Sequence, residues 1–338
     1  MTTEPAAYRI TATDMHTGGE PFRIVESGYP SVLGATLLDK RRYVQAELDH
    51  LRTALLHEPR GHADMYGVVL VEPDLPEADL AALFMHNSGY STMCGHGVIA
   101  LGRYAVDQGL VSKQEPLTRL VIQCPCGPVA VQVEVEDGRT GAVSFRSVPA
   151  FAPYPDLKVQ VKGYGRVSCG VAYGGAFYAI SDAAEFGLDV RRSPVAELVR
   201  AANALSETVK TRIDLTPHSP AGLGFLYGSI LTDGKDGDSV SVNVCVFADS
   251  QVDRSPTGSG VTARMALRHA LGQVEVGEER IFESVIGSVM TGCVVEELDL
   301  DNGDRGVGVE VGGHAYYSSK ATFVIEPDDP FRHGFLVR

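Results

Sequence analysis

Two glycine-rich segments of similar sequence, about half a chain apart, constrain the fold most. Residues 94–100 (CGHGVIA) and 257–263 (TGSGVTA) share both glycines, the valine and the alanine at an offset of 163 positions. A second pair, residues 16–19 (HTGG) and 172–175 (AYGG), shares its double glycine at an offset of 156 positions. Two nearly equal offsets indicate an internal repeat. The sequence therefore predicts two similar domains, each presenting a glycine-rich helix start to a shared cleft.

The remaining pattern predicts an α/β fold with two pseudo-symmetric domains. With 338 residues the chain fits two domains of roughly 150 residues. We expect a first domain over 1–152 and a second over 153–325, joined by a Pro- and aromatic-rich link at 149–155, with the tail 326–338 free to pack back onto the first. Helical spacing predicts helices at 37–56, 98–106, 194–205 and 261–271. Alternating and β-branched stretches predict strands at 8–13, 22–26, 66–71, 81–86, 120–123, 129–135, 142–147, 167–173, 176–180, 224–231, 239–247, 281–286, 289–298, 306–311 and 315–325.

Charge and cysteine usage exclude several classes of function. The net charge of −14 and the pI near 5.1 disfavour nucleic acid and anionic membranes as partners, because both bind basic surfaces. No apolar run reaches the roughly 18 residues of a membrane helix. The chain start has no export signal, so we expect a cytoplasmic protein without disulfides. Cys124 and Cys126 are the single close cysteine pair, and without a second pair of ligands we expect no metal site.

The paired loops have a chemistry of their own. Backbone N–H groups at a helix start lack intrahelical partners, and with the helix dipole they favour an anion, so two facing helix starts could grip one carboxylate. The same field lowers the pKa of a thiol, which predicts that Cys94 forms a thiolate near neutral pH. A phosphate-binding loop is excluded, because neither segment has the Gly-Lys-Ser/Thr ending or the dinucleotide-binding spacing.

Two neighbouring side chains allow more than one interpretation from the sequence alone. His96 is either a packing or capping residue at the helix start, or a group that steadies the thiolate or donates to a substrate carboxylate. Asp253 is either half of a surface ion pair with Arg254, or the group that holds a substrate ammonium.

These segments resemble the proline racemase family, whose members carry a Met-Cys-Gly-His loop and an Asp-Arg-Ser-Pro-Cys/Thr-Gly-Thr/Ser-Gly loop. Here the loops are residues 93–97 and 253–260, and further likeness at 14–21, 59–62, 173–178, 284–288 and 329–331 extends it nearly end to end. The resemblance implies a diaminopimelate epimerase-like fold, with the active site in the cleft between the domains, a cyclic imino acid as substrate and no cofactor. It also suggests a homodimer. Carried onto matching positions, it implies Cys94 as proton acceptor and substrate contacts from Gly95, His96, Asp253, Gly258 and Ser259.

The chain departs from the family's racemases at Thr257, where they place a second cysteine. Inversion needs a base on each face of the Cα carbon, and a threonine hydroxyl does not ionise usefully near neutral pH. The Cys94/Thr257 pairing instead implies a hydro-lyase that dehydrates trans-3-hydroxy-L-proline to Δ1-pyrroline-2-carboxylate. In that substrate the Cα hydrogen and the leaving hydroxyl lie on one ring face, so a single thiol is sufficient.

Two alternatives remain open from the sequence. The first is a 4-hydroxyproline 2-epimerase or proline racemase in which a water relay replaces the second thiol. The second is a non-catalytic imino-acid-binding protein that has kept the fold.

Overall fold

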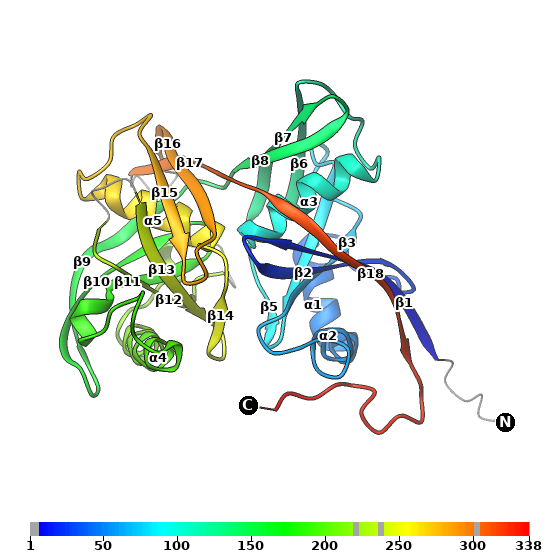
Figure 1. The fold of residues 1–338 in the computed structure, drawn as a ribbon, viewed down its shortest axis with the longest axis horizontal. Coiled ribbons are helices and arrows are strands. Elements are labelled where there is room, and N and C mark those ends of the chain that lie inside the picture. Colours follow the sequence, from blue (N-terminus) through cyan, green and yellow to red (C-terminus); the bar gives the residue numbers. More distant parts are fainter. Residues whose placement is uncertain (1–6, 219–222, 236–239, 301–304, 338) are drawn as a thin grey trace.

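The computed structural model describes residues 7–218, 223–235, 240–300 and 305–337, which form two lobes side by side (Figure 1). The chain start that underlies the expected location lies outside this description. So do residue 239 of the strand expected at 239–247 and residue 338 of the tail.

The first lobe is a mixed sheet with helices packed against it. It contains β1 (Tyr8–Thr17), β2 (Glu20–Ser27), α1 (Leu37–Glu47), α2 (Asp49–Leu56), β3 (Tyr66–Val71), β4 (Leu80–His86), β5 (Gly89–Tyr90), α3 (Gly95–Asp107), β6 (Leu117–Cys124), β7 (Gly127–Glu136) and β8 (Arg139–Arg146). Strand β2 runs parallel to β3, β3 antiparallel to β4 and β4 parallel to β6, while β6, β7 and β8 form a meander. Helix α3 is buried along most of its length against β7 and β8, which fixes the direction of its N-terminus.

The second lobe repeats this order, with a single helix in place of α1 and α2. It contains β10 (Gly165–Tyr173), β11 (Phe177–Asp182), α4 (Val195–Arg212), β12 (Leu226–Thr232), β13 (Val240–Phe247), β14 (Gln251–Asp253), α5 (Gly258–Ala270), β15 (Glu279–Ser284), β16 (Val289–Asp299) and β17 (Arg305–Gly313), with short 3-10 turns at Ala183–Phe186 and Thr216–His218. The parallel pairs β11–β12 and β13–β15 match β2–β3 and β4–β6. Helix α5 therefore corresponds to α3, as the paired glycine-rich segments predict.

Two strands cross between the lobes and change the expected boundaries. Strand β18 (Ala315–Ile325) pairs antiparallel with β1 along its length, so residues 315–325 hydrogen-bond to the first lobe, whereas the sequence predicts them in the second domain. Its counterpart β9 (Phe151–Val161) follows β8 but pairs with β10. The expected link at 149–155 is thus largely strand, and Pro153 and Pro155 are tolerated because they lie where the β9–β10 register shifts. A strand is placed by the free edge that accepts its hydrogen bonds, which residue alternation does not reveal.

The helix expected at 37–56 is two helices. Helix α1 begins at a capping box formed by Thr36 and Asp39, and ends at Glu47, because the φ of −120° at its C-cap Leu48 is not helical. Helix α2 restarts at once with Leu51 and Leu55 buried, so the bend turns both helices toward the same core as Val44.

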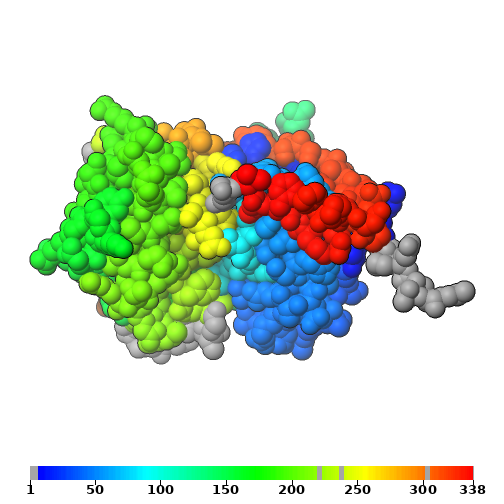
Figure 2. Space-filling view, turned by 90° about the horizontal axis from the view of Figure 1, so that it is seen from below, coloured from blue at the N-terminus to red at the C-terminus, as the bar shows by residue number. Residues whose placement is uncertain are grey.

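The C-terminal segment closes over the first lobe. Figure 2 shows it lying across the N-terminal half. Arg60 donates to Asp329 at 2.9 Å, and Phe335 forms a backbone bridge with Glu58. Among the described residues, no helix is both long and apolar enough to cross a membrane.

Candidate active site

The N-termini of α3 and α5 meet at the centre of the molecule, at Gly95 and Gly258. A Cβ atom on Gly95 would lie 2.5 Å from Gly258 Cα, and one on Gly258 would lie 2.7 Å from Gly95 Cα. Only glycine fits such an approach. The N–H groups and the positive dipole ends of both helix starts therefore converge on one place, where they favour an anion such as a carboxylate.

One small cavity lies between the lobes at this junction. Every residue singled out from the two loops lines it: Cys94, Gly95, His96, Asp253, Thr257, Gly258 and Ser259. Five more residues complete the wall: Tyr66, Met93, Tyr178, Tyr227 and Phe247. The cavity is small, with about 10 Å³ open to the centres of water-sized molecules, which is too little for a five-membered ring unless the lining rearranges. Within the described ranges, no three His, Cys, Asp or Glu side chains are grouped as metal ligands.

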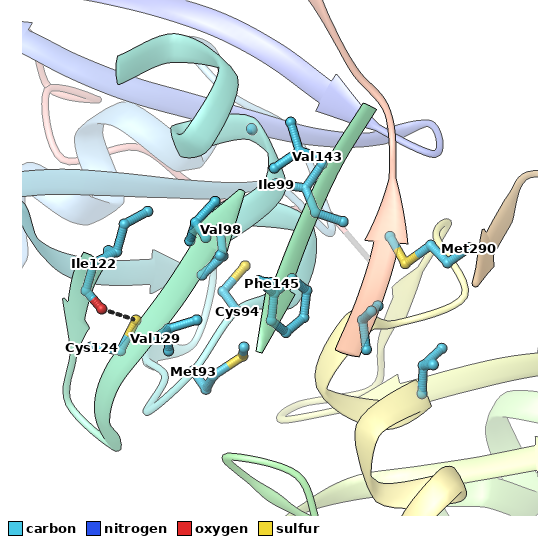
Figure 3. Packing of buried hydrophobic residues seen from close by; sticks show 14 of the residues in the cluster. Met93, Cys94, Val98, Ile99, Ile122, Cys124, Val129, Val143, Phe145 and Met290 are labelled. Atoms are coloured by element: carbon cyan, nitrogen blue, oxygen red, sulfur yellow. Dashed lines mark hydrogen bonds between the residues drawn. The ribbon is translucent and has the colours of Figure 1, made fainter. Parts of the chain in front are cut away.

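Cys94 caps the N-terminus of α3. Its Sγ accepts a hydrogen bond from Gly97 N at 3.3 Å, and Figure 3 shows the thiol among the buried side chains of Met93, Val98 and Phe145. Burial raises the pKa of the Cys94 thiol well above its usual value; the Gly97 hydrogen bond lowers it, and the carboxylate of Asp253 raises it again. The expectation of a lowered pKa is therefore wrong for the closed cavity. The helix terminus acts as proposed, but desolvation outweighs it.

His96 lies between the thiol and the acidic group of the second loop. Its Nε2 is 3.3 Å from Cys94 Sγ, and its Nδ1 is 3.9 Å from Asp253 Oδ2. Burial lowers the pKa of His96, against an increase caused by Asp253, so the ring is neutral near pH 7. Asp253 accepts a 2.7 Å hydrogen bond from Ser255 N, which leaves its second oxygen facing the cavity side of His96. Of the two interpretations of Asp253, the surface ion pair is wrong, because the residue is buried.

Thr257 holds the position that corresponds to Cys94, at the N-cap of α5. Its backbone has φ +70° and ψ 93°, a strained conformation for a β-branched residue. The hydroxyl is buried next to the Cys245 thiol and bonds to no oxygen or nitrogen of the described residues. The helix gains no side-chain cap from Thr257, so capping does not explain why a hydroxyl stands there.

Sequence reasoning missed the aromatic wall and one acidic residue. Tyr66 and Tyr227 donate and accept across the lobes with their oxygens 2.7 Å apart, and Tyr178 bonds Ser259 Oγ at 2.7 Å. A signal existed for the first pair, because residues 66–67 and 227–228 repeat the dipeptide Tyr-Gly at an offset of 161. Glu20, from a segment with family likeness, is fully buried, and desolvation raises its pKa well above the usual value.

Known proteins match this chain along nearly its whole length. The family model described as Proline racemase matches residues 12–336. The human protein named trans-3-hydroxy-L-proline dehydratase is 52% identical over 99% of this chain and 96% of its own. A 3-hydroxyproline 2-epimerase of Burkholderia multivorans is 40% identical over 97% of this chain and 98% of its own. The crystal structure of an Agrobacterium vitis hydroxyproline epimerase with bound trans-4-hydroxy-L-proline has a TM-score of 0.89 at 26% identity, over 98% of this chain and 96% of that one. The expected epimerase-like α/β fold with two pseudo-symmetric halves is confirmed.

Proposed function

Because the chain belongs to the proline racemase family, we propose that it is a hydro-lyase that dehydrates trans-3-hydroxy-L-proline, with Cys94 as the base. The observation that carries this proposal is the unequal pair at the two helix starts. Cys94 and Thr257 occupy equivalent N-cap positions and line the same cavity, and only one of them can ionise to a useful base. The imino acid that the relatives are named for dehydrating, trans-3-hydroxy-L-proline, carries its Cα hydrogen and its C3 hydroxyl on the same ring face, so a single base is sufficient.

The substrate carboxylate would bind where the helix starts meet. Backbone N–H groups at Gly95 and Gly258, together with Ser259, present donors to it, and the two helix dipoles stabilise charge that develops on it during proton removal. The ring ammonium would lie at Asp253, whose carboxylate is buried and close to neutral His96. This arrangement points the Cα hydrogen toward one N-cap side chain.

Substrate binding would also activate the thiol. In the closed cavity, Asp253 and Glu20 raise the pKa of Cys94 in addition to burial. A substrate ammonium placed against Asp253 offsets that negative charge, and so favours the thiolate when it is needed. The Cys94 thiolate then removes the α-proton, and the electron pair of the Cα–H bond forms the Cα–C3 double bond as hydroxide leaves C3. The enamine tautomerises to Δ1-pyrroline-2-carboxylate.

The test is a product assay with a matched cysteine control. Wild-type protein incubated with trans-3-hydroxy-L-proline should form a cyclic imine, and Cys94→Ser should form it at least about 10²-fold more slowly. Cys293→Ser is the control, because Cys293 is a free thiol in β16 that does not line the cavity. Sustained inversion at Cα without imine would favour the epimerase alternative, for which the Burkholderia multivorans relative gives a reason. Binding without solvent deuterium at Cα would leave only an imino-acid-binding protein.

The cysteines bear on the compartment in which the protein works, and the family bears on its assembly. Six free cysteines and a thiol base suit a reducing compartment, so we propose the cytoplasm. Assembly as a homodimer is a prediction from the family.

A further inference from the structure

Tyr66 and Tyr227 are equivalent residues of the two lobes whose hydroxyls touch. Each stands near the start of the matching strands β3 and β12 and is followed by glycine. Their oxygens lie 2.7 Å apart, and both residues are buried. Equivalent residues that touch must lie on the pseudo-twofold axis that relates the lobes. Gly95 and Gly258 touch on the same axis. The cavity lies along this axis, with Cys94 and Thr257 on either side.

The surroundings of the pair keep both hydroxyls protonated. Burial raises the pKa of Tyr66 and of Tyr227 well above the usual value, and the charge of Cys94 raises both further. The ring of His86 packs against both tyrosines, with its centroid 5.5 Å from that of Tyr66 and 6.0 Å from that of Tyr227. Burial lowers the pKa of His86 to about 3, so this neighbour is uncharged near pH 7. Phe247 stacks on Tyr227 at 5.3 Å. The pair is thus neutral: one of its two hydroxyl protons lies in the bond between the two oxygens, and the Ser91 hydroxyl, within hydrogen-bond reach of Tyr66, is the acceptor that a substrate hydroxyl would replace for the other.

The pair faces the part of the substrate that no other group addresses. With the carboxylate at the helix starts and the ammonium at Asp253, the ring carbons C3 to C5 must project toward the aromatic wall. On that wall, the Tyr178 hydroxyl is already bonded to Ser259. The Tyr66–Tyr227 pair is left to meet a substituent at C3, and Cys94, which lines the same cavity, is close enough for its charge to raise the pKa of both hydroxyls.

We propose that the Tyr66–Tyr227 hydroxyl pair is the general acid that protonates the leaving C3 hydroxyl; this rests on the proposed dehydration. Cys94 Sγ takes the α-proton and the C3–O bond breaks with its electron pair on oxygen. One tyrosine hydroxyl gives its proton to that oxygen, which leaves as water. The second tyrosine hydroxyl donates a hydrogen bond to the phenolate oxygen of the first. The Cys94 thiol then returns a proton to the pair. The α-proton and the hydroxide thus leave as one water molecule, and no oxidant or reductant takes part.

A substrate with fluoride in place of the C3 hydroxyl separates the acid role of the tyrosine pair from its role in packing. Fluoride departs without prior protonation, so trans-3-fluoro-L-proline needs the base but no acid. Tyr66→Phe and Tyr227→Phe should each slow dehydration of trans-3-hydroxy-L-proline by about 10²–10⁴-fold. The same variants should release fluoride within about 10-fold of the wild-type rate, which also shows that they fold and keep an active Cys94. The double variant should be no slower than the slower single one, because the two hydroxyls act as a unit.

The control is Tyr104→Phe: Tyr104 lies on α3 outside the cavity, and its hydroxyl donates to Glu26 of β2. It should match wild type with both substrates. The proposal is overturned if the tyrosine variants lose water and fluoride release to the same extent, which would make the pair a packing element, or if they dehydrate at the wild-type rate. A wild-type protein that forms no imine from trans-3-hydroxy-L-proline but still releases fluoride would refute the proposed function rather than this role.

Discussion

Replacing Thr257 with cysteine should convert an enzyme that works on one face of Cα into one that works on both. Residue 257 is the N-cap of α5, as Cys94 is of α3, and both line the same cavity. The new thiol would stand on the opposite side of the pseudo-twofold axis from Cys94. Inversion needs this second group, since one base must remove the proton while an acid delivers another from the far side.

The magnitude follows from what Thr257 does and does not contribute. A positioned acid or base is worth about 10²–10⁴-fold in rate, so racemisation of L-proline should rise by at least about 100-fold. Little stability should be lost, because the threonine hydroxyl bonds to no oxygen or nitrogen of the described residues. Cysteine is not β-branched, so part of the strain of about 1–3 kcal/mol at φ +70° should even be relieved.

The assay is chiral separation of proline after incubation with L-proline under reducing conditions, with Thr257→Ser as the control. Serine relieves the same strain and keeps a hydroxyl but brings no thiol, so it should form no D-proline above wild type. The reasoning is refuted if Thr257→Cys folds, still dehydrates trans-3-hydroxy-L-proline, and forms D-proline no faster than the serine variant. Position 257 would then not face Cα.

Three further predictions concern the helix junction and the buried acids. Gly95→Ala should abolish dehydration by driving the helix starts apart, whereas Gly141→Ala, whose Cβ has an ordinary 3.4 Å contact, should match wild type in the imine assay. Since burial and Asp253 raise the pKa of Cys94, kcat/KM should climb with pH above neutrality. Asp253→Asn should shift thiolate formation to lower pH, measured by the ultraviolet absorbance of the thiolate with Cys94→Ser as the blank. A titration curve at the wild-type pH would contradict this. Glu20 has a folded-state pKa raised above its ordinary 4.5, so the wild type loses stability as pH rises from the unfolded value through the folded one. The Tm advantage of Glu20→Gln should therefore grow with pH over that window, and a constant difference would count against a raised pKa.

The sequence predicts the meeting of the two loops because their repeat is long enough to stand out. Four identities in seven residues at 94–100 and 257–263 indicate equivalent helix starts, and these do meet. The Tyr-Gly repeat at Tyr66 and Tyr227 is only two residues long, and its importance appears only when the oxygens are found 2.7 Å apart. The direction of the Cys94 pKa shift could not be predicted from the sequence, for a different reason. It depends on how much solvent the closed lobes exclude, and no local pattern encodes that.

The crossing strands give the molecule the architecture of a domain-swapped dimer fused into one polypeptide. β9 leaves the first lobe to complete the edge of the second, and β18 returns the exchange, while β8 and β17 pair across the axis. Neither half therefore closes its own sheet, and a fragment cut near residue 150 would leave the edge of β1 exposed. An ancestral half-length chain could have built the same cavity by exchanging its last strand with a second copy. In a single polypeptide the two N-caps are separate sequence positions, so one can be a thiol while the other is a hydroxyl.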